Sequence, residues 1–386
     1  MAAVDRAVTI EDLRKLALRR LPRFVGDYLE GAAGDGGGIR SNVDAFRQYR
    51  FVPRGLNDVT PVDTSNEVFG KKYASLFGIS AVGVAGIYRR HADELLAEAA
   101  RDANIPFILS GASMAPIETI AKIAPDHTWY QLYGAHTPEV TQDMLARAHD
   151  SGVKVLVYTV DYPLAPRSEV AARTGISMAT GPTLRTFPKL ALDALLHPYW
   201  TAEYLRNGGL AKLGSWEKYA PPGSSAKEIA AYYVERWNNT QTWQHLDLIR
   251  KSWSGPMVVK GLVHPDDVKR AVAAGADAVT VSNHGGNKLD CMQGCLESLR
   301  QVRAAVGPKV TLFFDGGIRR ASDILVAKAL GADHCFLGRA TIYGVTAGGL
   351  RGAKRAIDLL QSDLEYTMAM IGTRTVADIT RDHVAP

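Results

Sequence analysis

The feature that most constrains the fold is an alternation of short apolar segments with amphipathic ones, which begins near Ser75. The apolar segments predicted as buried strands are residues 78–84, 106–110, 128–133, 153–160, 256–260, 278–281, 309–314 and 334–337. All but one are followed promptly by an amphipathic stretch such as 93–103, 138–150, 265–274 or 321–330. Such repeated strand–helix units predict an α/β fold, a closed (β/α)8 TIM barrel rather than an open doubly wound sheet. No Gly-x-Gly-x-x-Gly opens any of the helices, which argues against a dinucleotide-binding sheet.

The segments outside these units predict two additions to a single domain that spans residues 1–386. Residues 1–74 are expected to form a helical extension, because Thr9 can cap a helix over 9–28 whose apolar residues recur at helical spacing. Residues 168–243 form a long insertion after the fourth strand, rich in Thr, Gly, Pro, Tyr and Trp. A connection of this length is typically a lid, a packing element or a membrane contact. We expect a lid or subunit contact, with weak peripheral membrane contact as the alternative.

Composition sets limits on function. The chain has 386 residues, of which 46% are hydrophobic and 22% charged, with a net charge of +5. That charge is too small over such a length to indicate a nucleic-acid partner, but it suits an anionic cofactor. The three cysteines and ten histidines show no metal-ligand spacing, so no metal is expected. The absence of a signal-like or membrane-spanning run predicts a cytoplasmic protein.

One stretch carries the strongest chemical signal. The strand 278–281 ends in Ser282-Asn283-His284-Gly285-Gly286. Glycines at that point let a backbone and a ligand approach closely, and a barrel keeps its chemistry at the carboxyl ends of its strands. A capped turn is the structural alternative for a histidine beside glycines.

A second signal predicts a phosphate site. Asp315-Gly316-Gly317-Ile318-Arg319 follows the seventh strand, and Gly338-Arg339 follows the eighth. Barrels bind phosphate on these loops through backbone N–H groups and a helix N-terminus. The planar guanidinium of an arginine can donate hydrogen bonds to two phosphate oxygens at once.

These motifs together resemble the FMN-dependent α-hydroxy-acid dehydrogenase/oxidase family, which includes glycolate oxidase, L-lactate dehydrogenase and mandelate dehydrogenase. The resemblance extends from about Ile10 to about Asp382. The resemblance implies FMN as the cofactor, a small-molecule substrate and a homo-oligomer, a tetramer in relatives. It leaves open whether O2, a quinone or another carrier takes the electrons. A location at the inner face of the membrane stays open as well, because lactate and mandelate dehydrogenases use the insertion region for membrane contact.

The resemblance also implies a role for each strand-end residue. His284 would remove a substrate proton while two electrons pass to flavin N5, and Asp161 would orient its ring. Lys260 would face the N1/C2=O edge of the flavin, and Tyr28 and Tyr133 would lie at the substrate. The remaining cofactor positions are Val82, Gly83, Ser110, Gln131, Thr159, Ser282, Asp315, Gly316, Gly317, Arg319, Gly338 and Arg339.

The chain departs from the family at the substrate carboxylate, where members keep two arginines. One of these positions is Ser168, with Arg167 just before it, and the other is Asn287. Losing one partner of a buried charged pair costs about 2–5 kcal/mol, or roughly 30- to several-thousand-fold in binding. A small hydroxy acid should then bind poorly unless a nearby cation, Arg167, Arg173 or Lys288, reaches the site.

The sequence therefore favours an FMN-dependent oxidoreductase acting on a CH–OH or CH–NH group of a substrate without the usual carboxylate clamp. Asparagine after the two glycines also resembles the mycofactocin-maturation branch, whose members oxidise a peptide-derived amine. The alternative is a conventional L-2-hydroxy-acid dehydrogenase or oxidase with a rebuilt carboxylate site. An FMN-barrel isomerase and a flavin-binding protein without turnover are further readings, and the set of His284, Asp161 and Lys260 argues against both.

Overall fold

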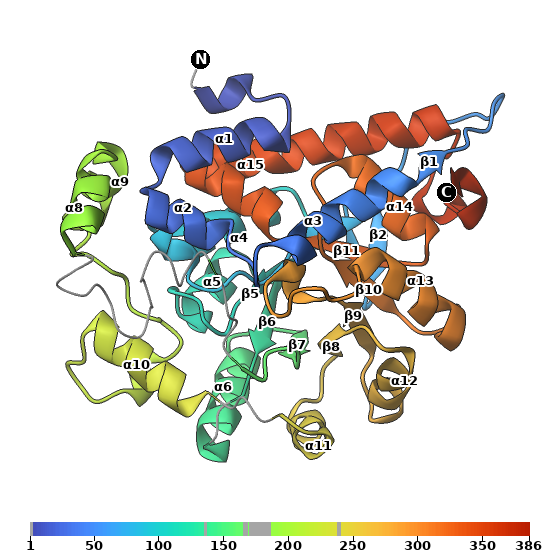
Figure 1. Ribbon diagram of the computed structural model, residues 1–386. Helices are drawn as coiled ribbons and strands as arrows, with labels where there is room; N and C mark the ends of the chain where they lie inside the picture. Colours follow the sequence, from blue (N-terminus) through green and yellow to red (C-terminus); the bar gives the residue numbers. More distant parts are fainter. Residues whose placement is uncertain (1–2, 135–136, 165–168, 170–186, 238–240) are drawn as a thin grey trace.

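The computed structural model describes residues 3–134, 137–164, 169, 187–237 and 241–386, and a closed barrel of parallel strands lies at its centre (Figure 1). The strands follow one another around the barrel in chain order, and the last pairs with the first. They are β4 (Phe77–Ile79), β5 (Phe107–Leu109), β6 (Thr128–Leu132), β7 (Leu156–Thr159), β8 (Met257–Leu262), β9 (Ala278–Val281), β10 (Leu312–Asp315) and β11 (His334–Leu337). Each overlaps one predicted strand, so the (β/α)8 prediction is confirmed.

Helices surround the barrel (Figure 1). They are α4 (Ala92–Asp102), α5 (Ile117–Ile123), α6 (Pro138–Asp150), α11 (Trp243–Ser252), α12 (Pro265–Ala273), α13 (Cys295–Val306), α14 (Ala321–Ala329) and α15 (Arg339–Ile371). The start of α12 shows why they form: the His264 side chain accepts from the Asp266 amide, Pro265 takes the first position, and acidic residues fill the first turn. Each of these features stabilises a helix N-terminus.

The N-terminal segment corrects one expectation, because residues 9–28 form two helices and not one. Thr9 caps α1 (Ile10–Arg20) in a capping box, as predicted, but α1 ends before Leu21 and α2 (Arg23–Leu29) follows Pro22. Proline lacks a backbone N–H and disfavours helical geometry at the residue before it. Beyond α2 lie α3 (Gly37–Asp44) and the 3-10 turn η2 (Ala45–Gln48), while η1 (Ala3–Arg6) precedes α1.

A hairpin closes the N-terminal end of the barrel. Its strands are β2 (Asn66–Val68) and β3 (Lys71–Tyr73). Val68 packs in the barrel interior among the rings of Trp129 and Phe313, and the Asn66 amide donates to the Asp333 carbonyl at 2.9 Å, just before β11. Since this end is covered, the carboxyl ends of the strands remain for chemistry. A short pair, β1 (Arg50–Phe51) with β12 (Val384–Ala385), ties the C-terminus back to the N-terminal segment.

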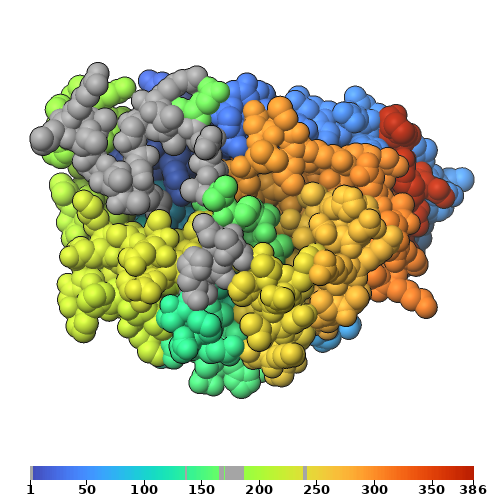
Figure 2. All heavy atoms as spheres, turned by 60° about the horizontal axis from the view of Figure 1, so that its bottom comes forward, coloured from blue at the N-terminus to red at the C-terminus, as the bar shows by residue number. Residues whose placement is uncertain are grey.

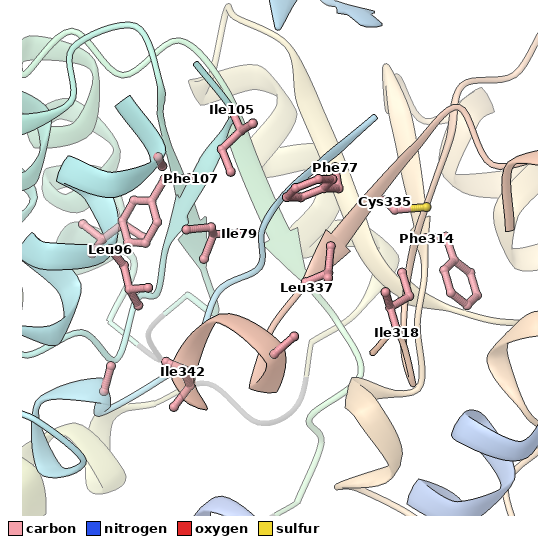
Figure 3. Close-up of a cluster of buried hydrophobic side chains, with 14 of the residues drawn as sticks. Phe77, Ile79, Leu96, Ile105, Phe107, Phe314, Ile318, Cys335, Leu337 and Ile342 are labelled. Atoms are coloured by element: carbon pink, nitrogen blue, oxygen red, sulfur yellow. The ribbon is translucent and has the colours of Figure 1, made fainter. Parts of the chain in front are cut away.

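The main core lies between the barrel wall and the helices. In Figure 3, Ile79 and Phe107 from neighbouring strands lie beside Leu96 of α4, and Ile342 comes from the start of α15. All four side chains are at most 2% exposed. Burying a side chain of this size stabilises the fold by about 1.5–3 kcal/mol, so the packing that closes the barrel also fixes its strand ends.

The insertion after β7 is described in part, as α8 (Phe187–Leu195), α9 (Pro198–Arg206), η4 (Glu217–Tyr219) and α10 (Ala226–Arg236). Its yellow-green residues form one flank of the molecule (Figure 2). The α8–α9 pair is attached to α2, because the Phe24 amide donates to Asp193 at 3.3 Å and the Phe24 ring meets the edge of Trp200. The remaining 3-10 turns are η3 (Ala85–Ile87), η5 (His284–Gly286), η6 (Val376–Asp378) and η7 (Arg381–His383).

Candidate active site

The turn η5, directly after β9, holds His284 in an unusual backbone conformation. His284 has φ of +56° and Gly285 has φ of +67°, and a left-handed non-glycine residue costs about 1–3 kcal/mol. The Ser282 hydroxyl accepts from the His284 amide at 3.0 Å, and the Asn283 side chain accepts from the Gly286 amide at 3.0 Å. The strained turn therefore fixes His284 at the carboxyl end of the barrel.

His284 forms a close pair with Asp161, which follows β7. His284 Nδ1 lies 2.8 Å from Asp161 Oδ1. Burial lowers the pKa of His284 to about 4, against the opposite pull of Asp161. Burial opposes ionisation of Asp161 too, but its interactions with His284, Lys260 and Lys288 together outweigh burial and lower the pKa of that carboxyl. An ionised carboxylate only accepts hydrogen bonds, so near neutral pH Nδ1 carries the ring proton and Nε2 keeps a free lone pair.

Aromatic side chains border this pair. Tyr133 Oη lies 3.5 Å from His284 Nε2, and burial raises the pKa of Tyr133 well above its usual value, so the phenol keeps its proton. The Tyr162 ring stacks 5.9 Å from the imidazole, centroid to centroid, and 4.1 Å from Trp237. Trp237 belongs to the insertion, directly after α10. The described end of the insertion therefore forms one wall of the site.

Lys260, in β8, is a buried ammonium between two polar groups. Its Nζ lies 2.9 Å from Asp315 Oδ2 and 2.9 Å from Ser282 Oγ. Burial disfavours its charge, but Asp315 and Asp161 outweigh this and raise its pKa. Lys260 is therefore a fixed positive charge beneath the strand ends, linked through Ser282 to the backbone amide of His284.

Several polar atoms at the strand ends lack a partner within the described residues. They are Gln131 Nε2, Thr159 Oγ1, Asp161 Oδ2 and Asp315 Oδ1, all buried. Gln131 Oε1, in contrast, accepts from the Ser110 hydroxyl at 3.2 Å and from the Gly111 amide at 3.1 Å, so its amide group has a fixed orientation. Buried polar atoms normally have partners, and a flat heterocycle edged with donors and acceptors, such as a flavin, fits this set. Val82 and Gly83 lie half-buried in the loop after β4.

The loops after β10 and β11 each carry an arginine, Arg319 and Arg339. Gly316 and Gly317 have φ of +127° and +81°, and α15 begins at Arg339 directly after Gly338. Arg319 and Arg339 form no ion pair with a carboxylate in the described part of the chain. Burial first, and then the charge of Arg319, lowers the pKa of Arg339. Like charges next to a helix N-terminus fit a bound phosphate.

Arg339 also has a role that the sequence does not reveal. Its guanidinium donates to the carbonyls of Leu29, Gly31 and Gly285 at 3.1, 2.8 and 3.0 Å. It therefore links the end of α2 to the turn that carries His284, at the start of α15.

Of the residues expected to contact the substrate, the structure describes some and leaves the others outside its described ranges. Tyr28, on α2, is 48% exposed and stacks on Tyr88, and Asn287 is half-buried directly after η5. Ser168, Arg167 and Arg173 lie outside the described residues. Tyr162 and Trp237 were missed as site residues: Tyr162 could have been found as the neighbour of Asp161, whereas nothing in the sequence marks Trp237 among the other aromatics of the insertion.

A (β/α)8 barrel whose strand ends present an oriented imidazole, a buried ammonium and a paired-arginine anion site defines a class of flavin-dependent oxidoreductases. Residues 17–386 match the family model described as FMN-dependent dehydrogenase. The chain belongs to that family, and FMN is its cofactor.

Individual relatives cover almost the whole chain. (S)-Mandelate dehydrogenase of Pseudomonas putida is 37% identical over 377 residues, which span 97% of this chain and 93% of the relative. L-Lactate dehydrogenase of Pectobacterium atrosepticum is 34% identical over 371 residues, 96% of this chain and 95% of the relative. A crystal structure of the monotopic membrane protein (S)-mandelate dehydrogenase superposes with a TM-score of 0.93 at 36% identity, covering 98% of this chain and 99% of the other.

Proposed function

We propose that the protein oxidises an L-2-hydroxy acid to the corresponding 2-oxo acid. The observation that carries the proposal is the His284–Asp161 pair, held at 2.8 Å at the mouth of an FMN-family barrel. The similar proteins are dehydrogenases of mandelate and lactate, which are both 2-hydroxy acids. This is the alternative reading of the sequence, and the family relationship supports it better than a substrate without a carboxylate.

The side chains divide the work. His284 Nε2 receives a proton from the substrate, and Asp161 stabilises the imidazolium that results. FMN, when bound, supplies the acceptor for the two electrons. The phenol of Tyr133, 3.5 Å from Nε2, donates to the substrate oxygen, and Tyr28 reaches the same oxygen or the carboxylate. The rings of Tyr162 and Trp237 cover the site and favour a substrate with an aromatic group.

The unpartnered atoms of Gln131 and Thr159 support the residues proposed for the cofactor. Gln131, Thr159 and Ser110 would hold the polar edge of the flavin, and Val82 and Gly83 would lie along it. Lys260, held by Ser282 at 2.9 Å, would place positive charge where the cofactor gains electrons. Asp315 would hold the sugar-like chain, and the phosphate would be held by Gly316, Gly317, Arg319, Gly338 and Arg339.

Oxidation of a neutral alcohol or an amine is the second candidate, and Asn287 favours it. Its amide offers only neutral hydrogen bonds where family members carry an arginine. Such a side chain leaves no unpaired charge beside a neutral substrate.

A substrate panel tests the two functions. L-Mandelate, L-lactate, a neutral alcohol and an amine are added anaerobically to the FMN-loaded protein, and the flavin absorbance is followed. We expect bleaching by the hydroxy acids in the wild type. His284→Gln should retain FMN but bleach about 100- to 10,000-fold more slowly, the usual contribution of a general base. Bleaching by only the neutral compounds would replace the proposal with the second candidate, and none at all would reject both.

We also propose that the protein works at a membrane surface and passes its electrons to a membrane quinone. Among the described helices, none combines the length and apolar composition that crossing a bilayer requires. The outer side of α8–α9, however, exposes large apolar residues: Leu192, Leu195, Leu196, Tyr199 and Leu205 are between 60% and 79% exposed. Several large exposed apolar side chains on one helix pair are uncommon on a protein with no partner, and the similar (S)-mandelate dehydrogenase is a monotopic membrane protein.

A further inference from the structure

Lys288 stands out because it is a half-buried cation near the His284–Asp161 pair with no hydrogen-bonded anion among the described residues. It follows Asn287 in the turn after η5. Within the described residues its ammonium makes no recorded hydrogen bond or ion pair, and its one recorded contact is with the Tyr162 ring, 2.9 Å from Nζ to the ring centroid. Lys260, the fully buried lysine of the site, has Asp315 at 2.9 Å.

Lys288 and His284 both lie against the ring of Tyr162. The Tyr162 ring that it contacts is also stacked on His284, at 5.9 Å between centroids. Burial lowers the pKa of Lys288 to about 7, Asp161 opposes this, and Lys260 adds to it. The charge of Lys288 in turn contributes to lowering the pKa of His284. Removing an ammonium charge from water in this way costs free energy unless an anion binds beside it.

We propose that Lys288 is the carboxylate-binding residue of this enzyme and replaces the arginine that Asn287 lacks. The proposal rests on the 2-hydroxy-acid function and specifies how the substrate is recognised. The hydroxyl and carboxylate of a 2-hydroxy acid are attached to neighbouring carbons, so an acid whose hydroxyl meets His284 Nε2 carries its charge close to the imidazole. Lys288 is the nearby cation without a described anionic partner, and the face of Tyr162 attracts and orients its ammonium.

The chemistry of lysine gives this site a distinct selectivity. An ammonium is a point charge with three rotatable donors, whereas arginine holds a carboxylate through a rigid double hydrogen bond. The carboxylate is therefore recognised by charge, with Asn287 and Tyr28 free to add neutral hydrogen bonds. Substrates should be separated by the presence of the negative charge more than by its geometry.

Binding of matched ligands tests the inference without turnover. Benzoate and benzamide, which differ in charge but hardly in shape, are titrated into the FMN-loaded protein, and the perturbation of the flavin spectrum gives each Kd. We compare wild type with Lys288→Gln, Lys288→Arg and Lys269→Gln, the last an exposed lysine on α12 paired only with Asp266. FMN content is measured for each variant, so a misfolded protein is recognised.

We expect Lys288→Gln to weaken benzoate binding by about 30-fold or more and to leave benzamide binding unchanged. Lys288→Arg should retain most of the benzoate affinity, and Lys269→Gln all of it. Equal weakening of both ligands, no change in either, or a wild type that binds benzoate no better than benzamide would each overturn the inference. A different result contradicts the proposed function itself: no hydroxy acid in the substrate panel bleaches the flavin of the wild type.

Discussion

Asp161 lies beside an imidazole and near two ammonium groups, and the protonation state of each depends on it. The carboxylate orients His284 directly at 2.8 Å, while Lys260 and Lys288 both contribute to lowering its pKa. Burial makes these interactions stronger than they would be in water. The result is a neutral base next to two ammonium groups, an arrangement suited to accept a substrate anion and then a proton.

This arrangement predicts two limits in the pH profile of kcat/KM for L-mandelate. His284 must be neutral to act as a base, so activity should fall as the pH drops towards its pKa of about 4. Lys288 must be protonated to attract the carboxylate, so activity should also fall as the pH rises above its pKa of about 7.

A variant and a neutral substrate show whether Lys288 causes the fall in kcat/KM at alkaline pH. In Lys288→Arg it should vanish, because a guanidinium stays charged, and for mandelamide it should be absent. The groups that face Lys288 are Asp161, which raises its pKa, and Lys260, which lowers it. A profile for mandelate that stays flat from pH 6 to pH 9, about two pH units above Lys288, would contradict the assignment.

At the scale of elements, the site depends on how β7 and β8 end. The pairing of β8 with β9 shifts register between Lys260 and Leu262, and Gly261 at the bulge has φ of +105°. A Cβ on Gly261 would lie 2.4 Å from Asp161 Cγ. The bulge therefore lets the Asp161 carboxyl lie directly over β8, where it meets His284, and only glycine fits there.

Gly261→Ala should accordingly displace Asp161 and lower kcat by about 100-fold, the usual effect of misplacing a catalytic group by about 1 Å. Gly70→Ala is the matched control, because Gly70 also has a positive φ, +76°, but an added Cβ there meets no atom within 4 Å. Both variants should lose stability by about 1–2 kcal/mol from backbone strain. Rapid flavin reduction in Gly261→Ala would show that Asp161 does not need this position.

At the scale of the whole molecule, one end of the barrel is closed by packing and the other is open for the site. The hairpin of β2 and β3 packs against one end with Val68 and Tyr73, and the other end carries the site. The insertion contributes Trp237 to the site through one segment and exposes the apolar surface of α8–α9 through another. A single insertion could thus bring the site close to a membrane acceptor. The tetramer implied by the family remains a prediction.

Membrane contact through α8–α9 predicts that Leu195→Glu together with Leu196→Glu weakens binding to vesicles by at least about tenfold, since each leucine contributes about 1.5–3 kcal/mol when buried. Cosedimentation with anionic phospholipid vesicles gives the measurement. The control is Leu248→Glu with Met370→Glu, two exposed apolar residues (56% and 58%) on α11 and α15. Equal losses in both double variants would show that the α8–α9 surface is not the contact.

Much of the fold and of the cofactor site was determined by the sequence itself. Strand–helix alternation predicts a barrel, and the carboxyl ends of parallel strands meet at one rim, so residues that end different strands come together. The rule places the residues that end β7, β8 and β9 at one rim, and the family resemblance implied that Asp161 orients His284. The two side chains lie 2.8 Å apart, whereas the contact of Lys260 with Ser282 at 2.9 Å was not predicted. Local chemistry also predicted the Thr9 cap, although Pro22 divides the helix after it.

Tertiary structure decided what depends on packing between segments with no fixed spacing. Trp237 reaches Tyr162 because the insertion folds back over the rim, and Arg339 donates to the carbonyls of Leu29 in α2 and Gly285 in η5. The sequence showed that Asn287 replaces an arginine and named Lys288 among the nearby cations. That the Lys288 ammonium lies against Tyr162 without a described anionic partner follows only from the folded chain, because burial and the distance between charges are properties of the assembled site.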